Sequence, residues 1–511
     1  MDRWKSKMIS WADINYFGKE VEYVTDALNA RSISSSGKYT RQFEQNMCDI
    51  FSVEHSLSTS NGTVALQLAF MALGIKPGDK IIVPAYGFHA ATNVLLQMGA
   101  ELVFCDIDNE HWNQTLRTIK KKYTNDIKGI VLVYNWGACG DVKEIIEWSK
   151  SKNIWVVEDC AEAWFSKYED KYLGTYGDIA TFSMHAAKTI TSGEGGVVIT
   201  NNNSYYEHML QIRSHGLFDS KGSYKNVLPG NNFRLSNLHA SIACAQTEQY
   251  KEILLKQLSR ESKYRDILSK SRLVTIQQSN VNSSPEYWAT GVKLPIWLVH
   301  KRNEIQSILR DRGVDTRTGF CSVNELDYIS TVDDIGESNL LSGSIIVLPC
   351  SLSLSDNDAE YICNEFLSVI DLCINDSFVQ TREHLTLLEN FYTKIRQGQN
   401  GFRFFDNRDQ NVVKDHLHNE LYLVDNEVAG YSHLDVENEI CWLGIALEEK
   451  YYGTGLANII MDRLVSKAKS SGQKVVSLSV DYDNTSAIKL YEKFGFVIEN
   501  KDKHFHMTLT L

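Results

Sequence analysis

The chain of 511 residues has only 6 prolines and no run rich in serine and glycine, which argues against a long flexible tether. Its 10 cysteines are scattered and none stands in a Cys-x-x-Cys pair, so we expect reduced thiols rather than zinc ligands or disulfides. No apolar stretch approaches the roughly 20 residues that a membrane-spanning helix needs, and no apolar signal core follows the first residues. These absences predict a soluble, cytoplasmic protein without a metal centre.

Positive charge is also scarce. Lys and Arg number 52 against 64 Asp and Glu, a formal net charge of -12, which argues against a nucleic-acid groove. Hydrophobic residues make up 43% and aromatic residues 11% of the chain, enough to bury substantial cores. At this length we expect several domains.

The chain does contain a series of short apolar segments separated by helical stretches. These segments lie at residues 80–85, 101–106, 129–134, 154–158, 179–184 and 196–200. Strands that alternate with helices in this way predict an α/β fold with a mostly parallel sheet covered on both faces. Ligands of such sheets bind where strand ends meet helix starts.

Two of these segments are followed by residues that could act together. Lys188 comes after 179–184 with hydroxyl residues around it and a glycine pair shortly beyond. We expect it on the last turn of the strand, where burial disfavours the charged form of an amine, so that it can hold pyridoxal phosphate as a Schiff base. Asp159 follows 154–158 and could keep a pyridine nitrogen protonated. The alternative for Lys188 is an ordinary solvated cation.

A third signal lies near the start of the chain. Residues 59–66 are predicted to open an amphipathic helix that ends at Gly74, with Asn61 as a good N-cap. Gly62 would let the backbone approach a phosphate, whose charge suits the positive end of a helix. Gly62 and Thr63 are therefore predicted to cradle a phosphate.

Residues from about 8 to 372 resemble the sugar aminotransferases of the DegT/DnrJ/EryC1/StrS family, which have the fold of type I pyridoxal phosphate enzymes. Besides the segments already described, the matching stretches are residues 36–44, 78–88, 99–108 and 230–236. The resemblance implies a large pyridoxal phosphate domain at residues 1–249 and a small α+β lobe at 250–374. It also implies pyridoxal 5'-phosphate as the cofactor.

The same resemblance implies roles around the cofactor ring. Lys188 would be the covalent anchor and the catalytic base, and Asp159 would pair with the pyridine nitrogen. Phe88 would stack on the ring, with plain core packing as the alternative. Glu162 stands where many relatives have Gln near the phenolic oxygen. An ionised carboxylate there would repel a phenolate unless it is protonated or turned away.

At the phosphate, the resemblance implies that Ser183 joins Gly62 and Thr63. Asn232 would reach the phosphate of the neighbouring subunit's site, which implies a homodimer.

The family also contains dehydratases, which have His in place of the lysine. Here His185 lies three residues earlier and Lys188 is present, which favours transamination over dehydration. The resemblance implies glutamate as amino donor and a keto-sugar carried on a nucleotide as acceptor. His185 and the glycine-rich stretch 193–196 resemble members that aminate C4 of 4-keto-6-deoxyhexoses rather than C3.

A second site is predicted far downstream, at residues 445–468. An apolar strand runs into a glycine-punctuated turn and then into an amphipathic helix, so that backbone N–H groups converge and could hold a pyrophosphate. The residues of this turn are Tyr452, Gly453, Thr454, Gly455 and Leu456. A plain strand-to-helix turn is the alternative.

Residues 475–480 and 483–496 decide between these alternatives, because they resemble the closing half of the GNAT acyl-CoA N-acyltransferases. The match covers a third domain at 375–511 and implies acetyl-CoA as co-substrate. By that resemblance Asn484 would contact the CoA arm or the helix start, and Tyr491 would protonate the departing thiolate.

One residue of this domain differs from the family's usual pattern, and one catalytic role is left unassigned. Lys450 stands where the family's loop usually starts with Gln or Arg. The base that takes the amine proton is left open among Glu437, Glu439 and His433, which could instead be solvated hairpin residues.

The two activities together predict a bifunctional enzyme. It would aminate a nucleotide-linked 4-keto-6-deoxyhexose and then acetylate the new amine for a surface glycan. One alternative is a sugar 3-aminotransferase whose GNAT domain acts on an unrelated amine. Another is a regulator that binds pyridoxal phosphate without turnover.

Overall fold

The computed structural model describes residues 8–217, 225–397, 410–501 and 504–511. Residues 1–7, after which the sequence predicts no apolar signal core, lie outside these ranges. Contacts along the chain divide it into two compact units: Met1–Lys293 with Gln306–Phe366, and Leu294–Ile305 with Leu367–Leu511. Within the described ranges, no helix combines the length and the apolar character that a membrane crossing requires.

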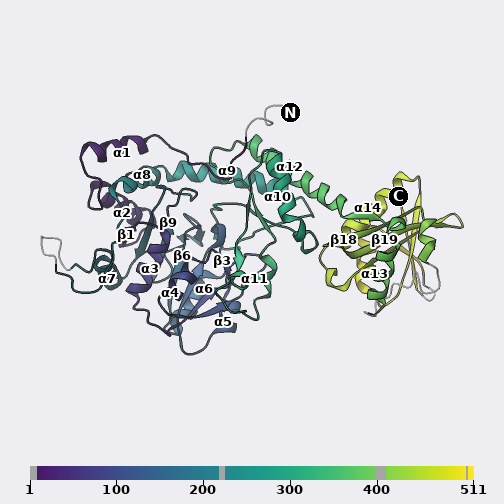
Figure 1. The fold of residues 1–511 in the computed structure, drawn as a ribbon, viewed down its shortest axis with the longest axis horizontal. Helices are drawn as coiled ribbons and strands as arrows, with labels where there is room; N and C mark the ends of the chain where they lie inside the picture. The colour runs from purple at the N-terminus through teal and green to yellow at the C-terminus, as the bar shows by residue number, and fades with distance from the viewer. Residues whose placement is uncertain (1–7, 218–224, 398–409, 502–503) are drawn as a thin grey trace. The chain divides into compact units, whose positions relative to one another are not determined.

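The first unit is built on a seven-stranded sheet (Figure 1). Its strands, in spatial order, are β1 (His55–Thr59), β10 (Gly196–Thr200), β9 (Ile179–Ser183), β6 (Trp155–Asp159), β5 (Ile127–Val133), β2 (Lys80–Pro84) and β4 (Glu101–Cys105). Only β10 runs antiparallel to its neighbours. The expected α/β fold with a mostly parallel sheet is confirmed.

Both faces of this sheet are buried because successive residues of each strand point to opposite sides. Ile130 and Leu132 of β5 join one core, and Val131 between them joins another. The helices that contribute to the first core include α2 (Lys38–Phe51), α6 (Val142–Ser151) and α8 (Asn237–Glu248). Those that contribute to the second include α3 (Gly62–Ala72), α4 (Ala90–Gln97) and α7 (Asn203–Arg213).

Helix α3 differs from its prediction. Its cap is as expected, because the Asn61 side chain accepts a hydrogen bond from the N–H of Val64 at 2.9 Å. The helix is not amphipathic, however, since most of its residues are buried. The reason is its position, because it contacts β9 of the sheet and also α4 and α7.

The rest of the first unit includes a small four-stranded sheet, in the order β11 (Thr275–Ile276), β13 (Gly291–Lys293), β16 (Ile345–Val347) and β14 (Arg317–Thr318). Further short strands are β3 (Tyr86–Gly87), β7 (Lys167–Tyr168), β8 (Lys171–Tyr172), β12 (Ser283–Ser284) and β15 (Cys321–Ser322). Further helices are α1 (Lys19–Asn29), α5 (Leu116–Lys122), α9 (Tyr250–Leu268) and α11 (Gly336–Leu341). The chain passes between the units at three places, after Lys293 at the end of β13, within α10 (Arg302–Asp311) and within α12 (Asp356–Asp376). The sequence-based limits at 249/250 and 374/375 stay predictions.

The second unit has its own seven-stranded sheet. In spatial order its strands are β17 (Phe378–Gln380), β18 (His418–Val424), β19 (Glu427–Glu437), β20 (Ile440–Leu447), β21 (Val475–Val480), β23 (Phe505–Thr510) and β22 (Val497–Lys501). Its helices include α13 (Leu385–Gln397), α14 (Leu456–Ser470) and α15 (Thr485–Lys493). All neighbouring strands are antiparallel except β20 and β21, which α14 connects.

The parallel pair β20 and β21 is joined along only part of its length. Cys441 pairs with Val476 and Trp442 with Ser477, and no later residue of β20 has a partner on β21. The two strands therefore separate toward their carboxyl ends, which leaves unpaired peptide groups where an extended ligand can lie between them.

Candidate active sites

Lys188 lies in the loop that joins β9 to β10, with its N–H bonded to the carbonyl of His185 at 2.9 Å. It is five residues past the end of β9, so the expected position on the last turn of that strand is wrong. Its side chain is only 14% exposed, and Nζ lies 2.9 Å from Oε1 of Glu162. The alternative of a solvated surface cation is therefore excluded.

Glu162 comes from the loop after β6 and is buried. While Oε1 faces Lys188, Oε2 accepts the N–H of Trp136 at 2.9 Å. Both oxygens are thus engaged, and the carboxylate is turned toward the lysine. A buried charge needs such a partner, because removing it from water is otherwise unfavourable. A role for Glu162 at the cofactor's phenolic oxygen stays a prediction.

Asp159 is the last residue of β6 and is also buried. Burial raises the pKa of this carboxyl to about 6, although Oδ1 accepts the N–H of Ala161 at 3.1 Å and Lys188 is near enough to lower it. A carboxylate in this state would be stabilised by a positively charged partner. A protonated pyridine nitrogen is such a partner.

The start of α3 lies close against the end of β9. A Cβ added to Gly62 would lie 2.8 Å from Cβ of Ser183, so only glycine fits here. Thr63 is exposed in the first turn. The first N–H groups of a helix have no partner within it and favour an anion. The close approach at Gly62 and the buried Asp159 therefore fit pyridoxal phosphate, and Gly62 at its phosphate and Asp159 at its ring nitrogen stay predictions.

Two other predicted cofactor residues are exposed. Phe88 follows β3, is 64% exposed, and contacts Phe320 edge-on with ring centroids 6.1 Å apart. It is not a core residue, so stacking on the cofactor stays the prediction for it. Asn232 lies in a segment that runs beside the end of β1, and its Oδ1 accepts the Nε–H of Arg234 at 3.0 Å. Its reach into a neighbouring subunit also stays a prediction.

Trp288 is a site residue that sequence reasoning missed. Nζ of Lys188 lies 3.7 Å from the centre of its ring, and its Nε1–H donates to the carbonyl of Ala187. The indole face attracts the ammonium group and holds the loop next to it. Trp288 is 100 positions away from Lys188 in a stretch with no motif, and the aromatic pair Tyr287-Trp288 was the only sequence signal.

In the second unit, the predicted turn has the geometry of an anion site. Gly453 and Gly455 have positive φ values of 71° and 88°, and no atom lies within 4 Å of where a Cβ on either would be. Leu456 begins α14, so the first N–H groups of this 15-residue helix lack partners within it. Tyr452 is half exposed beside them. Lys450 is 3.2 Å from Glu448, so its charge is partly neutralised.

Tyr491 and Asn484 lie on α15 and at its start. Burial raises the pKa of the Tyr491 hydroxyl, which keeps the group protonated and able to donate. Asn484 caps the helix, with Oδ1 accepting the N–H of Ala487 at 3.2 Å. This is the helix-start role that the sequence allowed for it.

The three candidate bases differ in exposure. Glu437 and Glu439 are exposed at the hairpin between β19 and β20, where Asn438 and Glu439 have positive φ. His433 is buried on β19, with its ring 4.8 Å from that of His416. The base stays unassigned among them.

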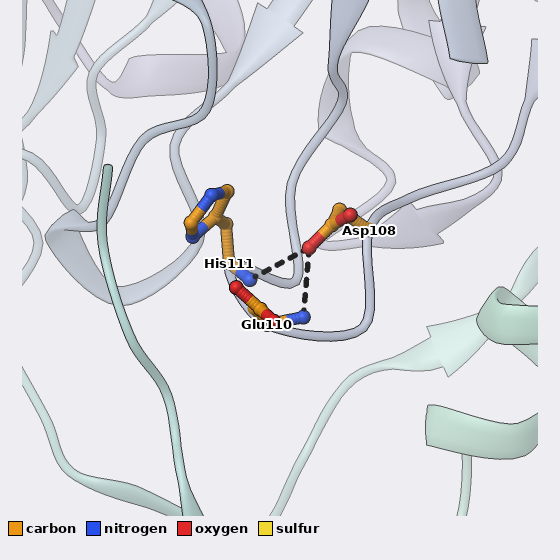
Figure 2. A group of neighbouring side chains, drawn as sticks. All are labelled: Asp108, Glu110 and His111. Atoms are coloured by element: carbon orange, nitrogen blue, oxygen red, sulfur yellow. Dashed lines mark hydrogen bonds between the residues drawn. The ribbon is translucent and has the colours of Figure 1, made fainter. Parts of the chain in front are cut away.

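One group of three possible metal ligands occurs among the described residues, namely Asp108, Glu110 and His111. Figure 2 shows Asp108 facing the backbone of the other two. Its Oδ1 accepts their N–H groups at 2.8 Å and 3.3 Å, so the carboxylate stabilises the turn that holds them. A carboxylate that accepts backbone N–H groups within its own turn gives no reason to assign a metal ion to these three residues.

The first unit has the fold of a type I pyridoxal phosphate enzyme, with a buried Asp159 and a Lys188–Glu162 pair, and in the second unit the parallel strands β20 and β21 pair along only part of their length. Residues 17–367 match the DegT/DnrJ/EryC1/StrS aminotransferase family, and 384–496 match the acetyltransferase (GNAT) family. The chain belongs to the aminotransferase family. It is a pyridoxal phosphate-dependent aminotransferase with a GNAT domain that uses acetyl-CoA.

Two relatives are similar over most of their length. A GDP-perosamine synthase of Escherichia coli O157:H7 is 38% identical over 363 residues, 69% of this chain and 96% of the relative. One from Vibrio cholerae is 32% identical over 68% of this chain and 95% of its own length. The aminotransferase TlmJ from Streptoalloteichus hindustanus superposes on 71% of this chain and 99% of its own with a TM-score of 0.68. At 23% identity, that likeness shows the fold.

Replacing Gly62 by Ala should weaken pyridoxal phosphate binding about tenfold or more, because the new Cβ must push Ser183 or the start of α3 aside. Absorbance titration of the cofactor-free protein measures this affinity. Gly336→Ala is the matched control, since nothing lies within 4 Å of its added Cβ. Equal affinity in the two variants would contradict the cradle.

Replacing Asp159 by Asn should stabilise the cofactor-free protein at neutral pH. The folded-state pKa of about 6 lies above the ordinary 3.8, so ionisation destabilises the fold increasingly as pH rises from 3.8 to 6, by about 3 kcal/mol in full. Urea unfolding should show the gain at pH 7.5 and none below pH 4. With cofactor bound the sign should reverse, because Asn cannot compensate a protonated ring nitrogen.

Proposed function

We propose that this chain transfers an amino group from glutamate to C4 of a nucleotide-linked 4-keto-6-deoxyhexose and then acetylates the new amine with acetyl-CoA. The observation that carries this proposal is the presence of both sites on one chain, since the first makes an amine and the second consumes one. Two relatives named GDP-perosamine synthase support the sugar, because perosamine is a 4-amino-4,6-dideoxyhexose. They also favour GDP as the nucleotide.

In the first reaction this chain's residues would bind and orient the cofactor, and one of them would move a proton. Pyridoxal phosphate supplies an electron sink for the carbon that gains or loses the proton. Asp159 would hold the ring nitrogen, and the Gly62 cradle would hold the phosphate. Nζ of Lys188 would anchor the cofactor. Once released from it, Nζ would carry the proton between the substrate carbon that bears the nitrogen and the cofactor. Glu162, which faces Nζ in the structure, would orient it.

The site would be completed by a second copy of the chain. Asn232 is exposed, as a residue that serves a neighbouring phosphate must be. We therefore propose a homodimer with shared cofactor sites.

A surface glycan would be the destination of the acetylated sugar.

In the second reaction the glycine turn of residues 452–456 would hold the pyrophosphate of acetyl-CoA. The ends of β20 and β21 would hold the pantetheine arm by backbone hydrogen bonds, because the residues of β20 beyond Trp442 have no partner on β21. The amine nitrogen would bond to the thioester carbonyl carbon as the C–S bond breaks, the hydroxyl of Tyr491 would give its proton to the departing thiolate, and the amine proton would pass to the base that stays unassigned.

Reciprocal variants separate the two reactions. Lys188→Ala should abolish amine formation from GDP-4-keto-6-deoxymannose and glutamate but leave acetylation of supplied GDP-perosamine intact. Tyr491→Phe should leave amination intact and slow acetylation about a hundredfold, because a general acid is lost. Mass spectrometry of the products measures both.

The wild-type protein supplies the decisive control. With keto-sugar nucleotide, glutamate and acetyl-CoA present together, the product should be the acetylated sugar. Free amino sugar alone would overturn the coupling and leave the acetyltransferase with another acceptor.

A further inference from the structure

The second unit is made of two separate stretches of chain. Besides residues from Leu367 onward it includes Leu294–Ile305, which lies inside the stretch 17–367 that matches the aminotransferase family. This short segment forms a 3-10 helix, η2 (Ile296–Lys301), in which Trp297 is 1% exposed. A residue from the aminotransferase part of the sequence is therefore buried within the acetyltransferase unit.

Trp297 makes two specific contacts there. Its ring meets that of Tyr422 on β18 edge-on, with centroids 5.7 Å apart and planes at 82°. Its Nε1–H donates to the carbonyl oxygen of Thr454 at 3.1 Å. Thr454 is the residue between Gly453 and Gly455 in the turn that precedes α14.

This turn needs an external anchor. Both of its glycines have positive φ and open space around them, and glycine permits many backbone conformations at little energetic difference. The hydroxyl of Thr454 is already bonded to the carbonyl of Tyr451 at one side. Its own carbonyl is held from the other side, by Trp297.

The carbonyl of Thr454 and the N–H of Gly455 belong to one peptide group. A trans peptide is planar, and its C=O and N–H point in opposite directions. Fixing the carbonyl on Trp297 therefore aims the Gly455 N–H away from the indole. That N–H lies directly before the first turn of α14, whose own N–H groups lack intrahelical partners.

We infer that Trp297 is a positioning residue of the acetyl-CoA site, which acts through the Thr454–Gly455 peptide on the pyrophosphate. Trp297 itself touches no reacting atom. This inference depends on acetyl-CoA use and not on which amine is acetylated, so it stands apart from the proposed sugar reaction.

The test compares two ligands in the full-length protein. Trp297→Phe keeps an aromatic ring and removes the donor, and it should raise the Kd of CoA about five- to tenfold, the effect of one hydrogen bond. Calorimetry measures this value. Pantetheine has the same thiol arm without the pyrophosphate, and its affinity, measured by displacement, should not change. The rate of the transamination half-reaction should be the same in the wild type and in Trp297→Phe.

Tyr422→Phe is the matched control, because it keeps the ring that packs on Trp297 and leaves the bond to Thr454 in place. Its CoA affinity should equal that of the wild type. Trp297→His, which retains a ring N–H, should recover part of the affinity that Phe loses.

An unchanged CoA affinity in Trp297→Phe overturns the inference, and so does an equal loss for CoA and pantetheine, which would indicate a general packing role. If Trp297→Phe melts at a lower temperature than the wild type, both affinities are measured below that temperature. The ratio of the CoA affinity to the pantetheine affinity then still separates a positioning role from a packing role.

Discussion

The contact between Lys188 and Glu162 is the constraint on which the aminotransferase site depends. Both side chains are nearly buried, and a buried charge without a partner destabilises a fold strongly. The carboxylate therefore fixes where the lysine nitrogen lies, and the indole of Trp288 limits its movement from another side. Asp159 at the end of β6 and Gly62 beside Ser183 at the end of β9 lie at the same edge of the sheet.

The parallel sheet explains why these groups converge. β6 and β9 are adjacent and run in the same direction, so Asp159, Glu162, Ser183 and the loop with Lys188 all follow the same edge of the sheet. The start of α3 reaches that edge because Gly62 can approach Ser183 without a Cβ between them. Charges of opposite sign and a helix start thereby come to the same edge of the sheet, although Gly62 and Lys188 are more than a hundred residues apart in the chain.

The sequence predicted those parts of the structure that depend on local patterns. Six of the seven strands of the large sheet, all except β1, follow from apolar segments, and the Asn61 cap and the glycine turn before α14 follow from backbone preferences. The positions of Trp288 and Trp297 could not be predicted, because each contact joins stretches with no common motif and is decided by packing. The conformation of the loop at Lys188 was also missed, since turns after a strand depend on hydrogen bonds such as that to His185. The sequence could not predict which way the Glu162 carboxylate points, for the same reason.

Both predicted phosphate sites lie at the start of a helix, yet the backbone freedom of their glycines differs. At α3 the glycine is confined, because Ser183 closes the space that a side chain would fill. At α14 the glycines are unconfined, and a loop with such freedom loses conformational entropy when a ligand orders it. A hydrogen bond from a buried indole lowers that loss by ordering one peptide in advance. The acetyltransferase unit therefore depends on a segment that lies about 150 residues earlier in the chain, and it is not defined by the C-terminal sequence alone.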